Sequence, residues 1–286
     1  LISGSTGDSI KNCKIYNYLS TGISVTSGNH VNIVANKFYQ TDTLFVDNND
    51  HSAIFINTAS SGSDDINVIR NIIGYSSGSQ NGSYSILTNC NSSSSIYGIY
   101  VKIPRTSVCD LQGNIISAMS VNCESPSVYG STDLYGILIK DGIVNTGDLE
   151  GNKIGSLTDS NSITNFYDIF GIYNSSLSSS WVCSNNEIGG ISLLGYSGYF
   201  SGIRADMQYA TLFDCQKNII GGVNSNSIRG YGEQGAFVGI RFQGPTAFIK
   251  ENTIRNFTDS LKQITFATTG SLIGISVEST GSNNVV

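Results

Sequence analysis

The sequence predicts an all-β protein built as a solenoid of parallel β-coils, and three observations lead to this prediction. A Gly-Ile pair recurs about every 36 residues along the chain. A second mark, Asn-x-Ile or a close variant, follows each pair at a nearly constant distance. Apolar and polar residues alternate around both marks, which is the period of a β-strand, and no helical apolar period persists for long.

The first mark predicts one strand per coil. Gly-Ile pairs begin at Gly22, Gly98, Gly136, Gly171, Gly202, Gly239 and Gly274, and Ala53-Ile54 fills the remaining place. The segments that follow, such as 98–101 and 136–139, alternate β-branched and variable residues, so we expect Ile and Val to face the interior. A Gly at this place fits a bend where a Cβ would clash.

The second mark predicts another short strand in each coil. It stands at Asn36, Asn71, Asn114, Asn152, Asn186, Asn218 and Asn252, with Cys13 in a degenerate first copy. The variable segments before the next Gly-Ile pair are rich in Ser, Gly, Asn and Tyr, and we expect them to form long loops at one corner. About seven to eight coils then make one domain over residues 1–286. We expect this domain to be a segment of a longer protein.

These marks resemble the right-handed, single-stranded parallel β-helix of the pectin-lyase-like superfamily, over essentially the whole chain. In that family an Asn at a tight corner points inward and stacks on its counterpart one coil away. Asn tolerates left-handed backbone there, and stacked amides satisfy one another. Right-handed winding follows from strand twist. The sequence pattern of the two marks, together with the Ser/Gly/Asn-rich loops, is also similar to repeat regions of large exported surface proteins of the Bacteroidota.

The amino-acid composition and charge limit the classes of function that the chain can have. The net charge is −6, which argues against a nucleic-acid partner, because such binding needs a basic stripe. No run of 18 apolar residues exists, so we expect no transmembrane segment. Hydrophobic residues make up 39% of the chain, enough for a core. Richness in Ser, Asn and Gly with few lysines is typical of exported proteins, so we expect an extracellular or cell-surface location.

One face of the predicted Gly-Ile strands carries the candidate ligand-binding residues. The row two residues after each Gly holds Tyr100, Leu138, Tyr173, Arg204 and Arg241, and beside it run Lys102, Lys140, Ser175, Asp206 and Gln243. Aromatic and cationic rows could hold a sugar chain by stacking and charged hydrogen bonds. The favoured alternative is an ordinary solvent face whose charges discourage aggregation. The ligand-binding hypothesis rests on Tyr100, Lys102, Tyr173, Arg204, Asp206 and Arg241.

The enzyme hypothesis finds less support. Lyases of the family need clustered carboxylates for calcium and a basic residue, and its hydrolases need paired carboxylates. The chain lacks the Gly-His-Gly and Arg-x-Lys motifs of the polygalacturonase branch. Among neighbouring coils, Arg204, Asp206 and Arg241 form the only group of mixed charge, which supplies no acid/base pair. We therefore expect no catalytic residues, metal or cofactor.

The preferred function is a non-catalytic structural or adhesive protein that binds a polysaccharide or another cell-surface ligand. We also expect covalently linked neighbouring domains. The alternative is a polysaccharide lyase or glycoside hydrolase of the same fold.

Two smaller features remain open. The polar run Asp47–His51 could hold calcium or supply an acid/base group, but we favour a solvated loop that enters a strand. Cys183 and Cys215 each stand three residues before a ladder Asn. We expect them to form an inward row of thiols, because a disulfide between in-register parallel neighbours is geometrically poor. Cys90 and Cys123 lie in successive loops and could cross-link them.

Overall fold

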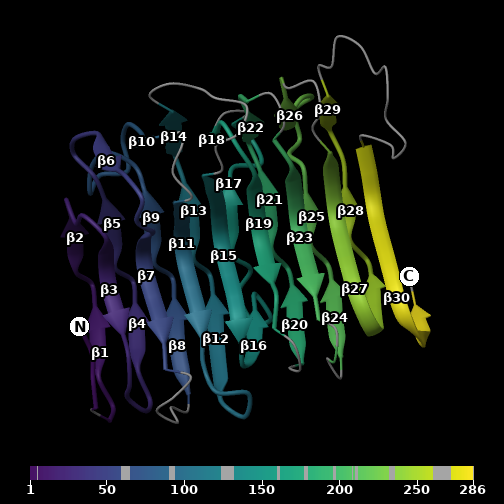
Figure 1. Ribbon diagram of the computed structural model, residues 1–286, viewed down its shortest axis with the longest axis horizontal. Coiled ribbons are helices and arrows are strands. Elements are labelled where there is room, and N and C mark those ends of the chain that lie inside the picture. The colour runs from purple at the N-terminus through teal and green to yellow at the C-terminus, as the bar shows by residue number, and fades with distance from the viewer. Residues whose placement is uncertain are drawn as a thin grey trace.

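A computed structural model describes residues 1–4, 6–58, 65–89, 94–123, 132–159, 162–176, 180–195, 198–207, 209, 212–231, 236–259 and 272–285. Within this part of the chain every regular element is a strand, and all strand pairs are parallel. The strands lie side by side along the long axis of the molecule, and the two ends of the chain lie at opposite ends of it (Figure 1). The predicted all-β parallel solenoid is confirmed.

Each coil contributes strands to four layers. The layer that carries the Gly-Ile pairs, called here the Gly-Ile arm, contains β3 (Thr21–Val25), β7 (His51–Asn57), β11 (Ser95–Lys102), β15 (Asp133–Asp141), β19 (Ile169–Asn174) and β23 (Phe200–Asp206). The next layer, the connecting arm, contains β1 (Ser9–Lys11), β4 (Asn32–Val34), β8 (Ile66–Ile69), β12 (Val108–Gln112), β16 (Ile143–Thr146), β20 (Trp181–Ser184) and β24 (Phe213–Gln216). The long strands β27 (Phe237–Lys250) and β30 (Leu272–Val285) run through both arms and join them into one 15-stranded sheet.

Two further sheets close the coils. The Asn-x-Ile sheet contains eight strands, β2 (Lys14–Tyr16), β5 (Lys37–Tyr39), β9 (Ile72–Gly74), β13 (Ile115–Ser117), β17 (Lys153–Gly155), β21 (Glu187–Gly189), β25 (Ile219–Ile220) and β28 (Thr253–Ile254). A seven-stranded sheet contains β6 (Leu44–Val46), β10 (Tyr84–Thr88), β14 (Met119–Cys123), β18 (Ile163–Asn165), β22 (Ile191–Leu193), β26 (Ile228–Gly230) and β29 (Phe257–Asp259). The Ser/Asn-rich segments expected as loops therefore also contain a strand in each coil.

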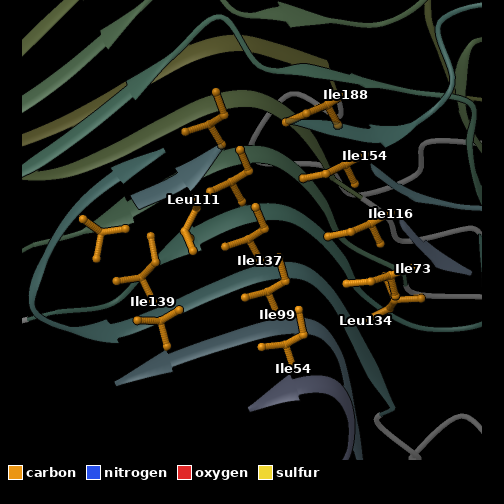
Figure 2. Packing of buried hydrophobic residues seen from close by; sticks show 14 of the residues in the cluster. Ile54, Ile73, Ile99, Leu111, Ile116, Leu134, Ile137, Ile139, Ile154 and Ile188 are labelled. Carbon is orange, nitrogen blue, oxygen red and sulfur yellow. The ribbon is translucent and has the colours of Figure 1, made fainter. Parts of the chain in front are cut away.

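The core consists of columns of identical or similar side chains. In the Gly-Ile arm, Ile54, Ile99 and Ile137 are in register and have no exposed surface. In the Asn-x-Ile sheet, Ile73, Ile116, Ile154 and Ile188 stack in the same way. Figure 2 shows both columns running from coil to coil inside the solenoid. Burial of a column residue removes apolar surface from water on every side, which stabilises the fold by about 1.5–3 kcal/mol per large side chain.

The seven predicted Asn residues form one continuous ladder along the axis. The Nδ2 and backbone N of each of the first six donate to Oδ1 of the Asn one coil further on, as in Asn114 to Asn152 at 3.0 Å and Asn152 to Asn186 at 3.0 Å. The remaining hydrogen of Nδ2 is donated to a backbone carbonyl of the preceding coil, which is Leu111 O at 2.8 Å for Asn152. The backbone N of Cys13 occupies the first step, because it donates to Asn36 Oδ1 at 2.9 Å. The expected ladder is confirmed, and its first six amide groups are satisfied although they are fully buried, whereas Asn252 at the end is partly exposed.

The corner geometry differs from the expectation in one respect. At six of the seven ladder positions the left-handed residue is the one that precedes the Asn and not the Asn itself, and the exception is Gly151 before Asn152. Such residues with positive φ are Ala35, Arg70, Gly113, Asn185, Lys217 and Glu251. The Asn can then point inward from extended backbone, while the turn is made one residue earlier by various residue types that accept the cost of about 1–2 kcal/mol.

The two sequence marks meet inside each coil. A Cβ added at Gly98 would lie 2.6 Å from the Gly136 carbonyl oxygen and 2.8 Å from Cδ1 of Ile116, in the Asn-x-Ile mark of its own coil. The same pair of contacts recurs at Gly171, with Gly202 O at 2.5 Å and Ile188 Cδ1 at 2.9 Å. The Gly is required because the Ile of the second mark fills the space where its side chain would be.

Candidate functional site

The predicted outward row exists in the expected register on the Gly-Ile arm. Tyr100 pairs with Leu138, Leu138 with Tyr173, Tyr173 with Arg204, and Arg204 with Arg241. Leu138 is only 1% exposed, however, although it points away from the core. The row is therefore not an open solvent face at its centre, since neighbouring side chains cover it.

A stack of aromatic rings forms this cover. Besides the predicted Tyr100 and Tyr173 it contains Phe55, Tyr97, Tyr135, Phe170 and Tyr199. The rings of Phe55 and Tyr100 stack at 4.5 Å, those of Tyr135 and Phe170 at 4.9 Å, and those of Phe170 and Tyr173 at 5.4 Å. In a stack, the face of each ring packs against the face of its neighbour, so these faces are not free for a ligand. The rings present mainly edges and hydroxyl groups to a ligand, rather than the free faces that the stacking hypothesis assumed.

The additional aromatic residues were missed because strict alternation fails at the Gly. Tyr97 and Tyr100 both lie outside, with ring centroids 5.3 Å apart, while Gly98 and Ile99 between them are both buried. The interruption moves the residue before each Gly to the outer face. Tyr97, Tyr135 and Phe170 all occupy that position, so a search of the residues preceding the Gly-Ile pairs would have found them.

Arg204 is the central charge of the stack. Its guanidinium carbon lies 4.8 Å from the ring centroid of Tyr173 and 5.6 Å from that of Phe170. Arg204 also forms an ion pair with Asp206 at 2.7 Å, and the Tyr173 hydroxyl donates to the same carboxyl oxygen at 2.8 Å. Burial first, and the Asp206 charge second, raise the pKa of Tyr173 to about 12. Arg204, Asp206 and Tyr173 thus form one unit. Arg241, which the sequence pattern groups with Arg204 and Asp206, pairs instead with Glu278 at 3.2 Å.

The second predicted row is broken by a β-bulge. The register shifts between Val101 and Lys102, so Lys102 lies opposite Asp141 and not opposite Lys140 as expected. Arg105 pairs with Asp141 at 3.2 Å. The pKa of Lys140 is lowered, first by partial burial of its ammonium group and second by the charge of Lys102. Two neighbouring cations therefore flank the aromatic stack at this point.

Two carboxyl groups before the Gly-Ile strands, those of Asp133 and Asp168, were also missed, and Asp50 of the polar run Asp47–His51 occupies the same place in its coil. Asp50, Asp133 and Asp168 stand three residues before Ala53, Gly136 and Gly171 respectively, so they share one phase of the repeat.

These carboxyl groups bind the edge of the aromatic stack. The Tyr97 hydroxyl donates to Asp50 Oδ2 at 3.4 Å, and the Tyr135 hydroxyl donates to Asp133 Oδ2 at 3.0 Å. Asp168 accepts the backbone N–H of Tyr199 at 2.8 Å. Leu134 N donates to the Asp168 carbonyl at 2.9 Å, which places Asp133 and Asp168 in neighbouring coils.

The environment shifts the pKa values of this acidic pair. Burial, as the largest cause, raises the pKa of Asp168 to about 6, and the charge of Asp133 adds to the rise. Burial also raises the pKa of Asp133, while the hydrogen bond from Tyr135 lowers it. A carboxyl group that titrates near 6 beside a second carboxyl group is an arrangement that acid/base chemistry uses.

The polar run at Asp47–His51 divides into two parts. Asn48, Asn49 and Asp50 are exposed in a bend, as the solvated-loop interpretation predicted. His51 is 2% exposed in β7 and belongs to the interior. Its Nδ1 is 3.0 Å from the Leu19 carbonyl oxygen, and its Nε2 contacts the Tyr84 hydroxyl, which donates to Tyr18 at 2.8 Å. Burial lowers the pKa of His51 to about 4.

We expect His51 to make stability fall as the solution becomes acidic. Its folded-state pKa is about 4 and lies below the ordinary value of 6.5, so the unfolded chain takes up a proton first. The contribution is fully present above pH 6.5 and is lost as pH falls toward 4, by up to about 3 kcal/mol. Urea denaturation of wild type and His51→Gln across this range should show a shallower pH dependence in the variant.

The second histidine supplies the control for this prediction. His30 is exposed and lies 3.5 Å from Asp65. His30→Gln should therefore keep most of the wild-type slope between pH 6.5 and 4. Equal slopes for wild type and His51→Gln would show that the buried imidazole does not cause the acid sensitivity.

The cysteines follow the expectation where the structure describes them. Cys183 and Cys215 are buried, free and in register, and each accepts a hydrogen bond from the Nδ2 of its own ladder Asn. Burial raises the pKa of the Cys183 thiol well above its usual value. Cys123 is disulfide-bonded, whereas Cys90 lies outside the described residues.

The described residues give no sign of a metal site or of a membrane-spanning helix. They contain no group of three or more His, Cys, Asp or Glu side chains placed to hold a metal ion, and no helix long and apolar enough to cross a membrane. Comparison with known proteins found no matching family model, no similar curated protein and no similar solved structure.

Proposed function

We propose that the chain is a non-catalytic structural or adhesive β-solenoid of the cell surface or extracellular space, and that its Gly-Ile arm binds a glycan. The observation that carries the proposal is the surface of stacked tyrosines with adjoining lysine and arginine groups, which repeats from coil to coil on one arm. Successive coils of a parallel sheet are about 4.8 Å apart, close to the length of one pyranose unit. A sugar chain lying along the axis could therefore meet equivalent groups at each coil.

The chemistry of this surface favours an anionic glycan. The ring faces are occupied, so contacts come from ring edges, hydroxyl groups and charges. Lys102 and Lys140 lower the cost of binding an anion, because an anionic group between them relieves their mutual repulsion. Carboxylate or sulfate groups on a polysaccharide have the required charge and accept hydrogen bonds from ammonium groups.

The proposal also covers the fold family, the cellular location and the mechanical role of the chain. The inward Asn ladder and the coil pattern support membership of the right-handed β-helices of the pectin-lyase-like superfamily, in the manner of exported Bacteroidota surface proteins. The disulfide at Cys123 supports an oxidising compartment outside the cytoplasm. The buried ladder and the in-register core columns support a load-bearing role, since each coil is held by its neighbours along its whole length.

A glycoside hydrolase is the second candidate, and the Asp133–Asp168 pair favours it. The strands of these two residues are neighbours at about 4.8 Å, which is near the roughly 5–5.5 Å carboxyl separation of retaining glycosidases. Asp168 has the raised pKa of a general acid. Asp133 would supply the nucleophile in that interpretation.

The decisive experiment measures binding and turnover on the same panel of anionic and neutral polysaccharides. We expect saturable binding of anionic members, a loss of at least about ten-fold in affinity for Lys102→Met with Lys140→Met, and no release of reducing ends. Lys217→Met is the matched control, because Lys217 is an exposed lysine at another corner of the coil. Absence of binding to every glycan would refute the proposal. Turnover that Asp168→Asn abolishes would replace it with the hydrolase.

A further inference from the structure

A cavity of about 310 Å³ lies on the outer face of the Asn-x-Ile sheet, away from the Gly-Ile arm. Its floor comes from one row of three neighbouring coils, in which Ile115 pairs with Lys153 and Lys153 with Glu187. Tyr75 and the segment Gly155–Thr158 also line it. A volume near 300 Å³ is at the lower end of small-ligand sites, so the cavity admits a ligand of about one sugar unit.

The wall of the cavity is held in place by the next coils. Ser156 N donates to the Gly189 carbonyl at 2.8 Å, and Val223 N donates to the Leu157 carbonyl at 2.9 Å. Asn224 Nδ2 donates to the Thr158 carbonyl at 2.7 Å. Within the segment, Ser156 Oγ accepts the N–H groups of Thr158 and Asp159. A ligand therefore meets a wall that is already ordered, and binding needs little further ordering of the chain.

The lining combines the two kinds of surface that a pyranose presents. Tyr75, Ile115 and Leu157 supply apolar area for the C–H face of a ring. Lys153 and Glu187, whose Nζ and Oε2 atoms are 3.2 Å apart, supply a donor and an acceptor for hydroxyl groups at its rim. The two charges cancel, so the cavity has no net charge to offset the cost of desolvating an ionised ligand, and a neutral ligand is favoured.

We infer that this cavity is a binding site for a single neutral hexopyranose unit, either a free sugar or the end of a glycan chain. The inference is independent of the proposed glycan surface, because it uses other residues on another sheet. It assigns donor and acceptor roles to Lys153 and Glu187 and a stacking role to Tyr75.

Titration of the isotope-labelled protein with neutral hexoses, N-acetylhexosamines and hexuronates, followed by amide NMR, tests the site. We expect saturable shifts at the amides of Ile115 and Gly155 with a neutral sugar, and weaker binding of the matching uronate. Glu187→Gln and Lys153→Met should each weaken binding at least about ten-fold. The control Glu251→Gln alters a similar ion pair, Lys217–Glu251, outside the cavity and should bind as wild type does.

Several outcomes would overturn the inference. These are no saturable shift at Ile115 and Gly155 with any neutral sugar, tighter binding of the uronate, or unchanged affinity in Glu187→Gln and Lys153→Met. The shift mapping uses the wild-type protein, so it decides the matter even if a variant fails to fold. Lys102→Met with Lys140→Met should leave this binding intact, which separates the cavity from the surface on the Gly-Ile arm.

Discussion

Asn152→Leu is expected to lower the free energy of unfolding by about 2–4 kcal/mol. Leu has the same number of side-chain heavy atoms and the same branching as Asn, but its methyl groups are bulkier than the amide, so crowding adds to the cost of the lost hydrogen bonds. Without the amide, the backbone N–H of Asn114 loses its acceptor in a fully buried place, and its Nδ2 loses one of two partners. A buried donor without an acceptor costs about 1–3 kcal/mol. Chemical denaturation of the variant and wild type measures the difference.

Asn67→Leu is the matched control for this prediction. Asn67 lies on the outer face of the connecting arm and donates to Asn32 Oδ1 at 3.1 Å. Its side chain is only partly buried, so water can replace the bond and the loss should stay below about 1 kcal/mol. If the two substitutions lowered the free energy of unfolding equally, the inward ladder would contribute no more to stability than a hydrogen bond on the outer face.

Gly171→Val is expected to cause the largest loss, of more than about 3 kcal/mol or of folding altogether. Its Cβ would lie 2.5 Å from the Gly202 carbonyl oxygen, which is backbone within the Gly-Ile arm and cannot turn aside. The same Cβ would also lie 2.9 Å from Cδ1 of Ile188, so it cannot shift toward the interior. Overpacking of a well-packed core costs typically 1–3 kcal/mol, and here the obstacle is backbone. The yield of folded protein and its thermal midpoint measure the effect.

The chain offers two controls for the steric argument. Gly274 belongs to the same motif, but no atom of the described residues lies within 4 Å of a Cβ added there, so Gly274→Val should be nearly neutral. In the Ile188→Ala background, Gly171→Ala should still destabilise but by less than it does in wild type, because the carbonyl contact remains after the side-chain contact is removed. A fully stable Gly171→Val would contradict the explanation of why the motif needs Gly.

The repeated marks predicted the fold because each mark has one structural task. Asn at the second mark and Gly at the first are the residue types that the ladder and the narrow interior require, so spacing alone located both. The left-handed corner was not predictable in the same way. Ala35, Arg70 and Lys217 share a backbone conformation but no chemical property, so no residue type marks the position.

The candidate surface was predicted less completely than the fold. The row of Tyr100, Tyr173 and Arg204 followed from simple alternation, and its register is as expected. Tyr97 was missed because alternation stops at the adjacent Gly, and the place of Lys102 was missed because a bulge shifts the strand by one residue. Such local departures arise from packing between coils, which a single repeat unit does not reveal.

The Asn ladder also gives the solenoid a direction. Every step donates toward the following coil and accepts from the preceding one, so the amide dipoles all point the same way and reinforce each other. The two ends of such a string have unequal requirements. A coil added before the string needs only a backbone N–H, which any residue but proline supplies, and Cys13 is such a case. The last amide, Asn252, donates to the carbonyls of Cys215 and Lys250, so a further coil continues the ladder only if it brings a side-chain acceptor such as that of Asn.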